Sequence, residues 1–244
     1  MATATSAYIS NQQKREQIAD GTMAFYFARP LHFEFRAGQS IDLTIVNPPQ
    51  TDAEGNTRTF SIASAPFDAD LMIATRMRDT AFKRVLRSAS PGLEVKVEGP
   101  GGSFTLHKNS AKAAVFLAGG IGITPFLSIV RQATRENFPH QLYLFYSNRR
   151  PEDAVFLDLL QQAAQQNNRF HLISTMTDMQ HSHRSWTGET GFIDQNMVRR
   201  YLPSTQGSIY YIAGPPAMVA AMRQMLVGAG VGEDDIRTEE FAGY

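Results

Sequence analysis

Residues 113–125, AAVFLAGGIGITP, join an unbroken apolar run to a glycine-rich turn and a proline. A continuous apolar run is typical of a strand covered on both faces, as in a parallel sheet. Pro125 favours the first turn of a following helix, where a missing N–H costs little. We therefore expect strand, turn and helix, with glycines that let the backbone approach a phosphate at the helix N-terminus. A tight structural turn without a ligand is the alternative.

The residues after this stretch alternate between strand-like and helix-like patterns. Apolar runs predict strands at 141–147, 169–175 and 208–213, and helical spacing predicts helices at 125–136, 151–166, 194–201 and 216–227. Such alternation is typical of a parallel α/β sheet. The acidic residues 233–240 are expected to be an exposed approach to the last strand.

The residues before this stretch have a different pattern. Short β-rich runs are separated by glycine and proline breakers, at 24–28, 39–46, 57–64, 70–76 and 94–98. Closely spaced short strands predict an antiparallel barrel or sandwich. One helix is expected near 82–86, with Thr80 as its cap. The sequence therefore predicts two domains: an antiparallel β-barrel over 1–107 and an α/β domain with a parallel sheet over 108–244.

Composition argues against several classes of protein. The 244 residues carry 23 Lys and Arg against 23 Asp and Glu, without the basic excess that is typical of nucleic-acid-binding domains. No apolar run approaches the ~18 residues that cross a bilayer, so the expected location is cytoplasmic. There is no cysteine, and therefore no disulfide, thiolate nucleophile or cysteine-held iron–sulfur cluster within these residues. Redox chemistry in this chain would need an organic cofactor.

Three further segments are candidates for a ligand site. Residues 211–218, YIAGPPAM, follow another apolar run, and the ends of parallel strands can line one crevice. Residues 58–64, RTFSIAS, combine an arginine suited to phosphate with an aromatic face and small hydroxyl groups. Residues 239–244, EEFAGY, place an aromatic ring where it can cover a planar ligand. Each segment also has a purely structural alternative. Residues 211–218 would then be a turn, residues 58–64 a barrel strand and residues 239–244 a frayed end. His181 and His183 stand in a polar loop with no further ligand, so no metal site is expected.

Together, these four motifs resemble, in order and spacing, those of the ferredoxin–NADP⁺ reductase family. The resemblance covers nearly the whole chain. It implies a stand-alone reductase without an iron–sulfur domain, in which an antiparallel barrel binds flavin and an α/β domain binds a pyridine nucleotide. The implied cofactor is FAD, with NADPH or NADH as co-substrate.

The resemblance implies flavin contacts in the barrel half. Arg58 would hold a flavin phosphate, Phe60 would lie against the isoalloxazine ring in place of the commoner tyrosine, and Ser61 would hydrogen-bond near N5. Thr80 would hold the pyrophosphate, which favours FAD over FMN. The other ring face would be covered by a C-terminal aromatic residue, Phe241 or Tyr244. The remaining flavin-binding residues implied in this half are Thr59, Ser64, Thr75, Arg76 and Met77.

The resemblance also implies nucleotide contacts in the α/β half. The pyrophosphate of the nicotinamide nucleotide would be bound by Gly119, Gly120, Gly122, Thr124 and Pro125. The nicotinamide pocket would include Gly214, Pro215, Pro216 and Met218, with Ala213 where a cysteine is common. Asn148 and Arg149 follow a strand and are candidates for the adenosine end, where an arginine can accept a 2′-phosphate. These residues do not decide between NADPH and NADH.

The implied chemistry needs no nucleophile. Hydride passes from nicotinamide to flavin N5, so the protein must stack two rings and hold phosphates. Ser61, Thr124 and Tyr244 are the expected catalytic residues, with Tyr244 as a gate that nicotinamide displaces. Electrons would pass to a separate ferredoxin, flavodoxin, oxygenase component or small acceptor, and the basic run 76–87 is either a docking patch or a solvated helix face. Two alternatives stay open: an NAD(P)H:flavin reductase that releases reduced flavin, and a redox-silent binding module on the same fold.

Overall fold

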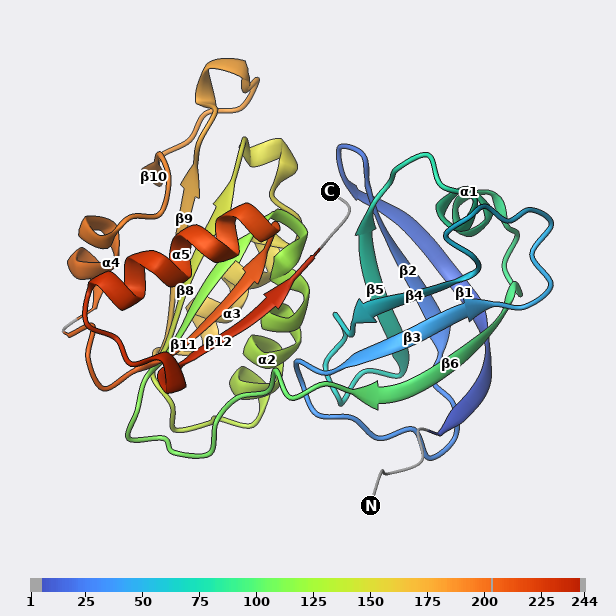
Figure 1. The fold of residues 1–244 in the computed structure, drawn as a ribbon, viewed down its shortest axis with the longest axis horizontal. Coiled ribbons are helices and arrows are strands. Elements are labelled where there is room, and N and C mark those ends of the chain that lie inside the picture. The colour runs from blue at the N-terminus through green and yellow to red at the C-terminus, as the bar shows by residue number, and fades with distance from the viewer. Residues whose placement is uncertain (1–5, 203, 242–244) are drawn as a thin grey trace.

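The computed structural model describes residues 6–202 and 204–241, which form two six-stranded sheets (Figure 1). The first sheet, in the order β4-β3-β6-β1-β2-β5, is antiparallel, and the second, in the order β10-β9-β8-β7-β11-β12, is parallel. This arrangement confirms the predicted fold class. The predicted boundary between residues 107 and 108 falls in the connection from β6 to β7. Within the two described ranges, no helix is long and apolar enough to span a bilayer.

The antiparallel sheet curls around an aromatic and aliphatic core as a half-barrel. One helix, α1 (Ala81–Ser88), packs onto this core through Phe82, Val85 and Leu86. The side chain of Thr80 accepts a hydrogen bond from the backbone N–H of Lys83, which confirms it as the cap of α1. The strands of this half are β1 (Ala7–Ala19), β2 (Thr22–Ala28), β3 (Ser40–Ile45), β4 (Thr57–Ser61), β5 (Asp70–Arg76) and β6 (Glu94–Gly101).

Strand β1 is the longest of the barrel, and the sequence pattern did not predict it. Its residues, AYISNQQKREQIA, are mostly polar. The strand pairs with β6 along its first part and with β2 along its second, so backbone hydrogen bonds to both neighbours define its place. Ser10 and Gln12 are its buried side chains, and the Ser10 hydroxyl donates to the Ala28 carbonyl across 2.6 Å. A strand of this kind lacks the apolar stripe that sequence periodicity detects.

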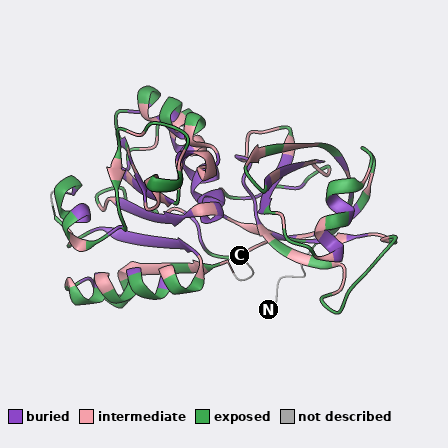
Figure 2. Ribbon diagram, turned by 90° about the horizontal axis from the view of Figure 1, so that it is seen from above, coloured by how far each residue is buried: buried purple, intermediate pink, exposed green. Residues whose placement is uncertain are grey.

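Helices cover both faces of the parallel sheet. Helices α2 (Thr124–Arg135) and α3 (Leu157–Gln166) pack on one face, and α4 (Gln195–Tyr201) and α5 (Pro216–Gly228) pack on the other. All six residues of β7 (Ala114–Gly119) are buried between these layers, as Figure 2 shows for the strands of this sheet. The remaining strands are β8 (Leu142–Asn148), β9 (Phe170–Met176), β10 (Glu189–Thr190), β11 (Ile209–Gly214) and β12 (Ile236–Glu240).

Two predicted elements differ from the structure. The expected helix over 151–166 is divided: Pro151–Asp153 forms a short 3₁₀ turn, and α3 begins only after Phe156. Phe156 has a left-handed φ of 60°, which a continuous right-handed helix does not allow. The acidic residues 233–240 are not an approach to the last strand but contain it, because β12 pairs with β11 over its whole length.

Helix α2 joins the two halves of the molecule. Ser128 is fully buried, and its hydroxyl donates to the Ser64 carbonyl of the barrel across 2.6 Å. Arg131 forms a two-point ion pair with Asp68, in which Nη2 lies 2.9 Å from Oδ1. Met72 and neighbouring barrel alanines share one apolar cluster with α2. The contacts of this helix therefore set the position of the barrel against the parallel sheet.

Ser128→Ala is expected to lower the free energy of unfolding by about 1–2 kcal/mol, because it leaves the buried Ser64 carbonyl without this donor. Urea unfolding followed by circular dichroism measures the change. Ser110→Ala, at an exposed position, is the control and should be neutral. An unchanged midpoint for Ser128→Ala would mean that the bond between the halves adds nothing to stability.

Candidate functional site

The candidate site lies where the carboxyl ends of the parallel strands face the barrel (Figure 1). It has two parts. The barrel cleft, of about 290 Å³, is lined by β4, β5 and the start of α1 on one side and by Thr124 and residues 239–241 on the other. The strand-end cleft, of about 560 Å³, follows the ends of β7, β8 and β9 and the start of α5. Consecutive residues of β5 connect the two, since Thr75 lines the barrel cleft and Arg76 lines the strand-end cleft.

The glycine-rich turn after β7 packs directly against the end of β11. A Cβ atom on Gly122 would lie 2.3 Å from the carbonyl oxygen of Ala213, which is too close for any side chain. Gly120 has a left-handed φ of 52°, which also favours glycine. The two predicted turns are thus brought together, and four of the residues that were predicted to bind the nucleotide line the strand-end cleft: Gly119, Gly120, Pro215 and Met218.

The two halves meet at a hydrogen bond between Ser61 and Glu239. Ser61 ends β4, and its hydroxyl donates to Oε1 of Glu239 on β12 across 2.8 Å. The other carboxyl oxygen of Glu239 is buried and has no hydrogen-bond partner among the described residues. Burial raises the pKa of Glu239, and the hydrogen bond from Ser61 opposes this effect. The barrel cleft thus contains a carboxyl group that is disposed to hold a proton beside Ser61.

Aromatic and small side chains complete the barrel cleft. Phe60 packs against Phe82 with ring centroids 5.9 Å apart, and Phe241 lines the opposite side. Thr124, at the start of α2, is 1% exposed and also lines this cleft. Tyr244, the other candidate for the aromatic cover and an expected catalytic residue, lies outside the described residues.

Three cations stand at the rim of the barrel cleft: Arg58, Arg78 and Lys83. Two carboxylates of the loop before β4 lie on this rim. Glu54 forms an ion pair with Arg58 at 2.6 Å, and Asp52 accepts a hydrogen bond of 2.7 Å from the first N–H of α1. That hydrogen bond lowers the pKa of Asp52. Anionic side chains of the chain itself therefore contact the groups that were predicted to hold phosphate.

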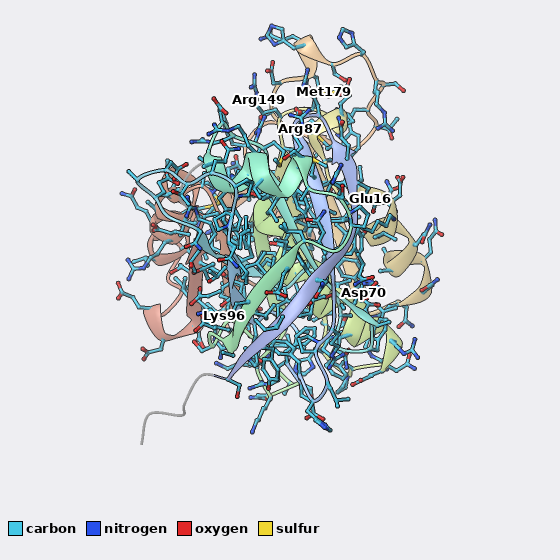
Figure 3. The ribbon with its side chains drawn as sticks, turned by 90° about the vertical axis from the view of Figure 1, so that its right-hand side faces the viewer. Glu16, Asp70, Arg87, Lys96, Arg149 and Met179 are labelled. Carbon is cyan, nitrogen blue, oxygen red and sulfur yellow. The ribbon has the colours of Figure 1, made fainter. Side chains whose placement is uncertain are left out.

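The strand-end cleft contains a buried amide without a partner. Asn148, the last residue of β8, is 6% exposed, and neither its Oδ1 nor its Nδ2 makes a hydrogen bond within the described part of the chain. The hydroxyl of the nearby Tyr146 donates to the Val155 carbonyl instead. A buried polar group of this kind is typical of a site that a ligand completes. Arg149 follows on the rim, and Figure 3 labels its side chain at this end of the molecule.

Several predicted residues lie away from both clefts. The Ser64 hydroxyl accepts a hydrogen bond from the Met72 backbone, and Ser64 lines a separate cavity beside α3. Five others shape the turns, begin helices or pack on the barrel core without lining either cleft: Met77, Gly122, Pro125, Gly214 and Pro216. Thr59 lines the barrel cleft, and its hydroxyl donates to Asp42.

Two residues contribute to the site although the sequence analysis gave them no role: Glu239, which lies within the motif 239–244, and Phe192, which lies in no motif. Glu239 lies level with Ala213 in the pairing of β12 with β11, so recognition of the last strand would have located it. Phe192 is 80% exposed on the wall of the strand-end cleft, and nothing in the surrounding sequence marks it. In residues 6–202 and 204–241, no three histidine, aspartate or glutamate side chains gather as a metal site requires.

Glu239→Gln is expected to stabilise the fold by about 1 kcal/mol at neutral pH and to have no effect in acid. Because burial raises the pKa of Glu239, the folded chain holds this proton more firmly than the unfolded chain. The stability of the unmodified protein should therefore fall as pH rises from the unfolded-state pKa through the folded-state pKa. Urea unfolding of both proteins across this range measures the difference.

The control for this experiment is Glu240→Gln, at the exposed neighbouring position, which should leave the pH profile of unfolding unchanged. A difference between Glu239→Gln and the unmodified protein that stays constant with pH would contradict the raised pKa.

Comparison with known proteins finds similarity to oxidoreductases. Residues 116–224 match the family model of the oxidoreductase NAD-binding domain. The phenol hydroxylase P5 protein of Acinetobacter pittii is 29% identical over 216 residues, covering 87% of this chain and 59% of that protein. Ferredoxin–NADP reductase B of Sorangium cellulosum is 29% identical over 232 residues, covering 88% of this chain and 92% of that protein. The chain spans 57% of a third relative, the reductase component of a propane 2-monooxygenase from Rhodococcus jostii, so some of its relatives are much longer.

Solved structures share the fold at lower sequence identity. The Amycolatopsis cytochrome P450 reductase GcoB superposes with a TM-score of 0.82 at 22% identity, covering 97% of this chain and 70% of that one. A ferredoxin–NADP⁺ reductase from Neisseria gonorrhoeae, solved with bound FAD and NADP, gives 0.80 at 20% identity, covering 96% and 98%. In its nucleotide-binding domain, its relatives and its pair of sheets, this chain is therefore similar to reductases of the ferredoxin–NADP⁺ reductase type.

Proposed function

We propose that this chain is an NAD(P)H-dependent flavoprotein reductase that carries FAD in the barrel cleft and passes electrons to a separate acceptor. The observation that carries the proposal is the meeting of the two clefts on β5, at Thr75 and Arg76. Residues 1–107 would form the flavin domain, and residues 108–244 the nucleotide domain with a tail that covers the flavin. Relatives named as ferredoxin–NADP reductase and NADH-cytochrome b5 reductase support this function.

The barrel cleft has the chemical groups that a flavin ring requires. Phe60 and Phe241 provide flat apolar faces, one from each half of the chain. The hydroxyl groups of Ser61 and Thr75 line the same cleft and can hydrogen-bond to ring nitrogens and oxygens. The aromatic faces and the hydroxyl groups fit a planar ring with polar edges.

The start of α1 has the groups that the phosphates of FAD require. Arg58 offers a planar fork of donors, and the N-terminus of α1 offers backbone N–H groups beside Thr80. Asp52 and Glu54 already hold these donors with carboxylate oxygens, which supports a preference of this position for negative charge. This second anion position favours FAD, with its pyrophosphate, over FMN.

The side chains of the protein would orient the two cofactors and hold a proton near the flavin. Bound FAD would supply the chemistry, by accepting hydride from nicotinamide and releasing electrons singly. Ser61 orients its hydroxyl on Glu239, and Glu239 can hold or release a proton at the Ser61 oxygen because burial raises its pKa. Thr124 lines the barrel cleft from the side of the α/β half, from which the nicotinamide would approach the flavin.

The nucleotide would occupy the strand-end cleft. The turns after β7 and β11 present Gly119, Gly120 and Pro215 to this cleft, and small residues let the phosphates approach the backbone closely. The unpartnered amide of Asn148 would then gain a hydrogen-bond partner.

The electron acceptor would lie outside these 244 residues, because they contain no cysteine to hold an iron–sulfur cluster. Relatives include a phenol hydroxylase protein and the reductase component of a propane 2-monooxygenase, which supports an oxygenase component or a ferredoxin as the acceptor. Arg78 and Lys83, at the exit of the barrel cleft, offer positive charge that would steer an acidic carrier.

Anaerobic titration with NADH and NADPH tests this function directly. The purified chain, loaded with FAD and passed through gel filtration, is expected to retain about one FAD per chain. Either coenzyme in excess should then abolish the visible absorbance of the oxidised flavin. Retained flavin that neither coenzyme reduces would contradict the proposed reductase and favour a redox-silent module.

The same gel filtration distinguishes the alternative reductase. A chain that loses FAD on the column but reduces added free flavin would be an NAD(P)H:flavin reductase that releases its product. A chain that binds no flavin at all would overturn both forms of the function.

Glu54→Gln is expected to tighten FAD binding by about twofold to fivefold, because it frees Arg58 from an exposed ion pair of small net stability. Fluorescence titration of the flavin-free protein at low salt measures the change. The control is Glu98→Gln, which removes a comparable ion pair with Lys96 elsewhere on the barrel and should leave FAD binding unchanged. Equal affinity in Glu54→Gln and the unmodified protein would place the FAD phosphates away from Arg58.

A further inference from the structure

A groove at the junction of the two halves lies apart from both clefts of the candidate site. This junction groove has a volume of about 670 Å³ and lies between β1, β2 and β5 of the barrel and the start of α3. Residues 151–157 separate it from the strand-end cleft, because Glu152, Ala154 and Phe156 line the groove, whereas Asp153 and Val155 line the cleft. An occupant of the junction groove would therefore lie outside the proposed nucleotide site.

The floor of the junction groove is apolar. Met72 of the barrel and Phe156 of the α/β half line it, and both pack in the core cluster that joins the two halves. Leu159, in the first turn of α3, is 42% exposed and extends this apolar surface to the outside of the molecule. The groove can therefore accept an apolar group without any change in the core.

The walls of the junction groove carry carboxylates from both halves of the chain. Asp70 begins β5 on the barrel side, and Asp158 lies in the first turn of α3 on the other side. Within the described residues, neither side chain forms an ion pair or a hydrogen bond. Glu16 and Glu152 add one further carboxylate to each wall, and Figure 3 labels Glu16 and Asp70 on the same side of the barrel.

The cations of the junction groove do not balance this negative charge. Arg131 is already held by Asp68 in the two-point ion pair between the halves. Arg184, from the loop after β9, is the other arginine in the lining. Carboxylates on facing walls repel each other, and a cation placed between them relieves this repulsion. The charge of the groove is therefore complementary to a basic group.

The groove continues over α3 into a second hollow. This hollow, of about 400 Å³, lies between α2 and α3 and shares Leu159 and Arg131 with the junction groove. Phe67 lines it, and the guanidinium carbon of Arg135 lies 4.5 Å from the centroid of the Phe67 ring. A compact organic cation would fill one hollow, whereas an extended chain can occupy both. The connected hollows thus favour a polypeptide segment as the occupant.

We infer that the junction groove is a docking site for a segment of a partner protein that carries lysine or arginine beside an apolar residue. The charged head of the basic residue would lie between Asp70 and Asp158, and its methylene groups would lie on the apolar floor. The apolar residue would cover Leu159. This inference goes beyond the proposed function and does not depend on it, because the groove is separate from both clefts.

Fluorescence anisotropy of a short labelled peptide with alternating lysine and leucine tests the docking site on the full chain at low salt. The peptide is expected to bind the unmodified protein, and Asp70→Asn combined with Asp158→Asn should weaken binding about tenfold. Arg184→Gln removes a competing cation and should tighten binding about threefold. Such a gain in affinity cannot arise from a misfolded variant.

A matched pair of substitutions controls for the overall charge of the protein. Glu94→Gln combined with Asp234→Asn removes one exposed carboxylate from each half, outside the junction groove, and should leave the affinity unchanged. A peptide of alternating glutamate and leucine should not bind, because the groove offers it no complementary charge.

Three results would overturn the inference. The first is equal affinity of the unmodified protein and the Asp70→Asn, Asp158→Asn variant. The second is equal weakening by this variant and by the control pair, which would mean attraction to net charge alone. The third is binding of spermine, dependent on Asp70 and Asp158, by a chain that does not bind the peptide, which would identify a site for small polyamines instead.

Discussion

The close approach of two backbone turns is the constraint on which this site depends. The turn after β7 lies so near the end of β11 that a side chain at Gly122 would collide with the Ala213 carbonyl. That contact fixes where α2 begins, and α2 in turn carries Thr124 to the cleft and Ser128 to the barrel. One steric requirement therefore positions both the ligand-facing turn and the helix that joins the two halves.

A second constraint is the burial of a carboxyl group where the two halves of the chain meet. Glu239 reaches the barrel cleft with one oxygen bonded to Ser61 and the other buried without a partner among the described residues. Such an arrangement costs free energy unless the carboxyl group holds a proton or a ligand supplies a donor. Asp178, by contrast, is in contact with Arg149 and His181, and these hydrogen bonds lower its pKa. The pKa values of these two carboxyl groups are thus shifted in opposite directions because their surroundings differ.

Much of the fold follows from local sequence pattern, and the exceptions have physical reasons. The apolar run at 113–118 and the alternation after it predict the parallel sheet, because fully covered strands must be apolar on both faces. Strand β1 carries no such pattern, since its place is defined by backbone pairing with two neighbours. Phe156 adopts a left-handed conformation that no propensity indicates. Glu239 lies in an acidic stretch whose partner strand is known only once the sheet is assembled. Local pattern thus predicts elements and turns, whereas a contact between distant strands requires the structure.

The acidic residues of the loop before β4, Asp52 and Glu54, also affect the charge balance at the rim of the barrel cleft. Arg58 and the N-terminus of α1 meet carboxylates of their own chain, from Glu54 and Asp52, before any ligand arrives. A bound phosphate would therefore replace the carboxylates of Glu54 and Asp52 as the anion beside these groups. The positive charges of the rim would be balanced both before and after the phosphate binds. The chain itself therefore neutralises positive charge on this rim while it folds. The proposed flavin would then be required for electron transfer and not for balancing these charges.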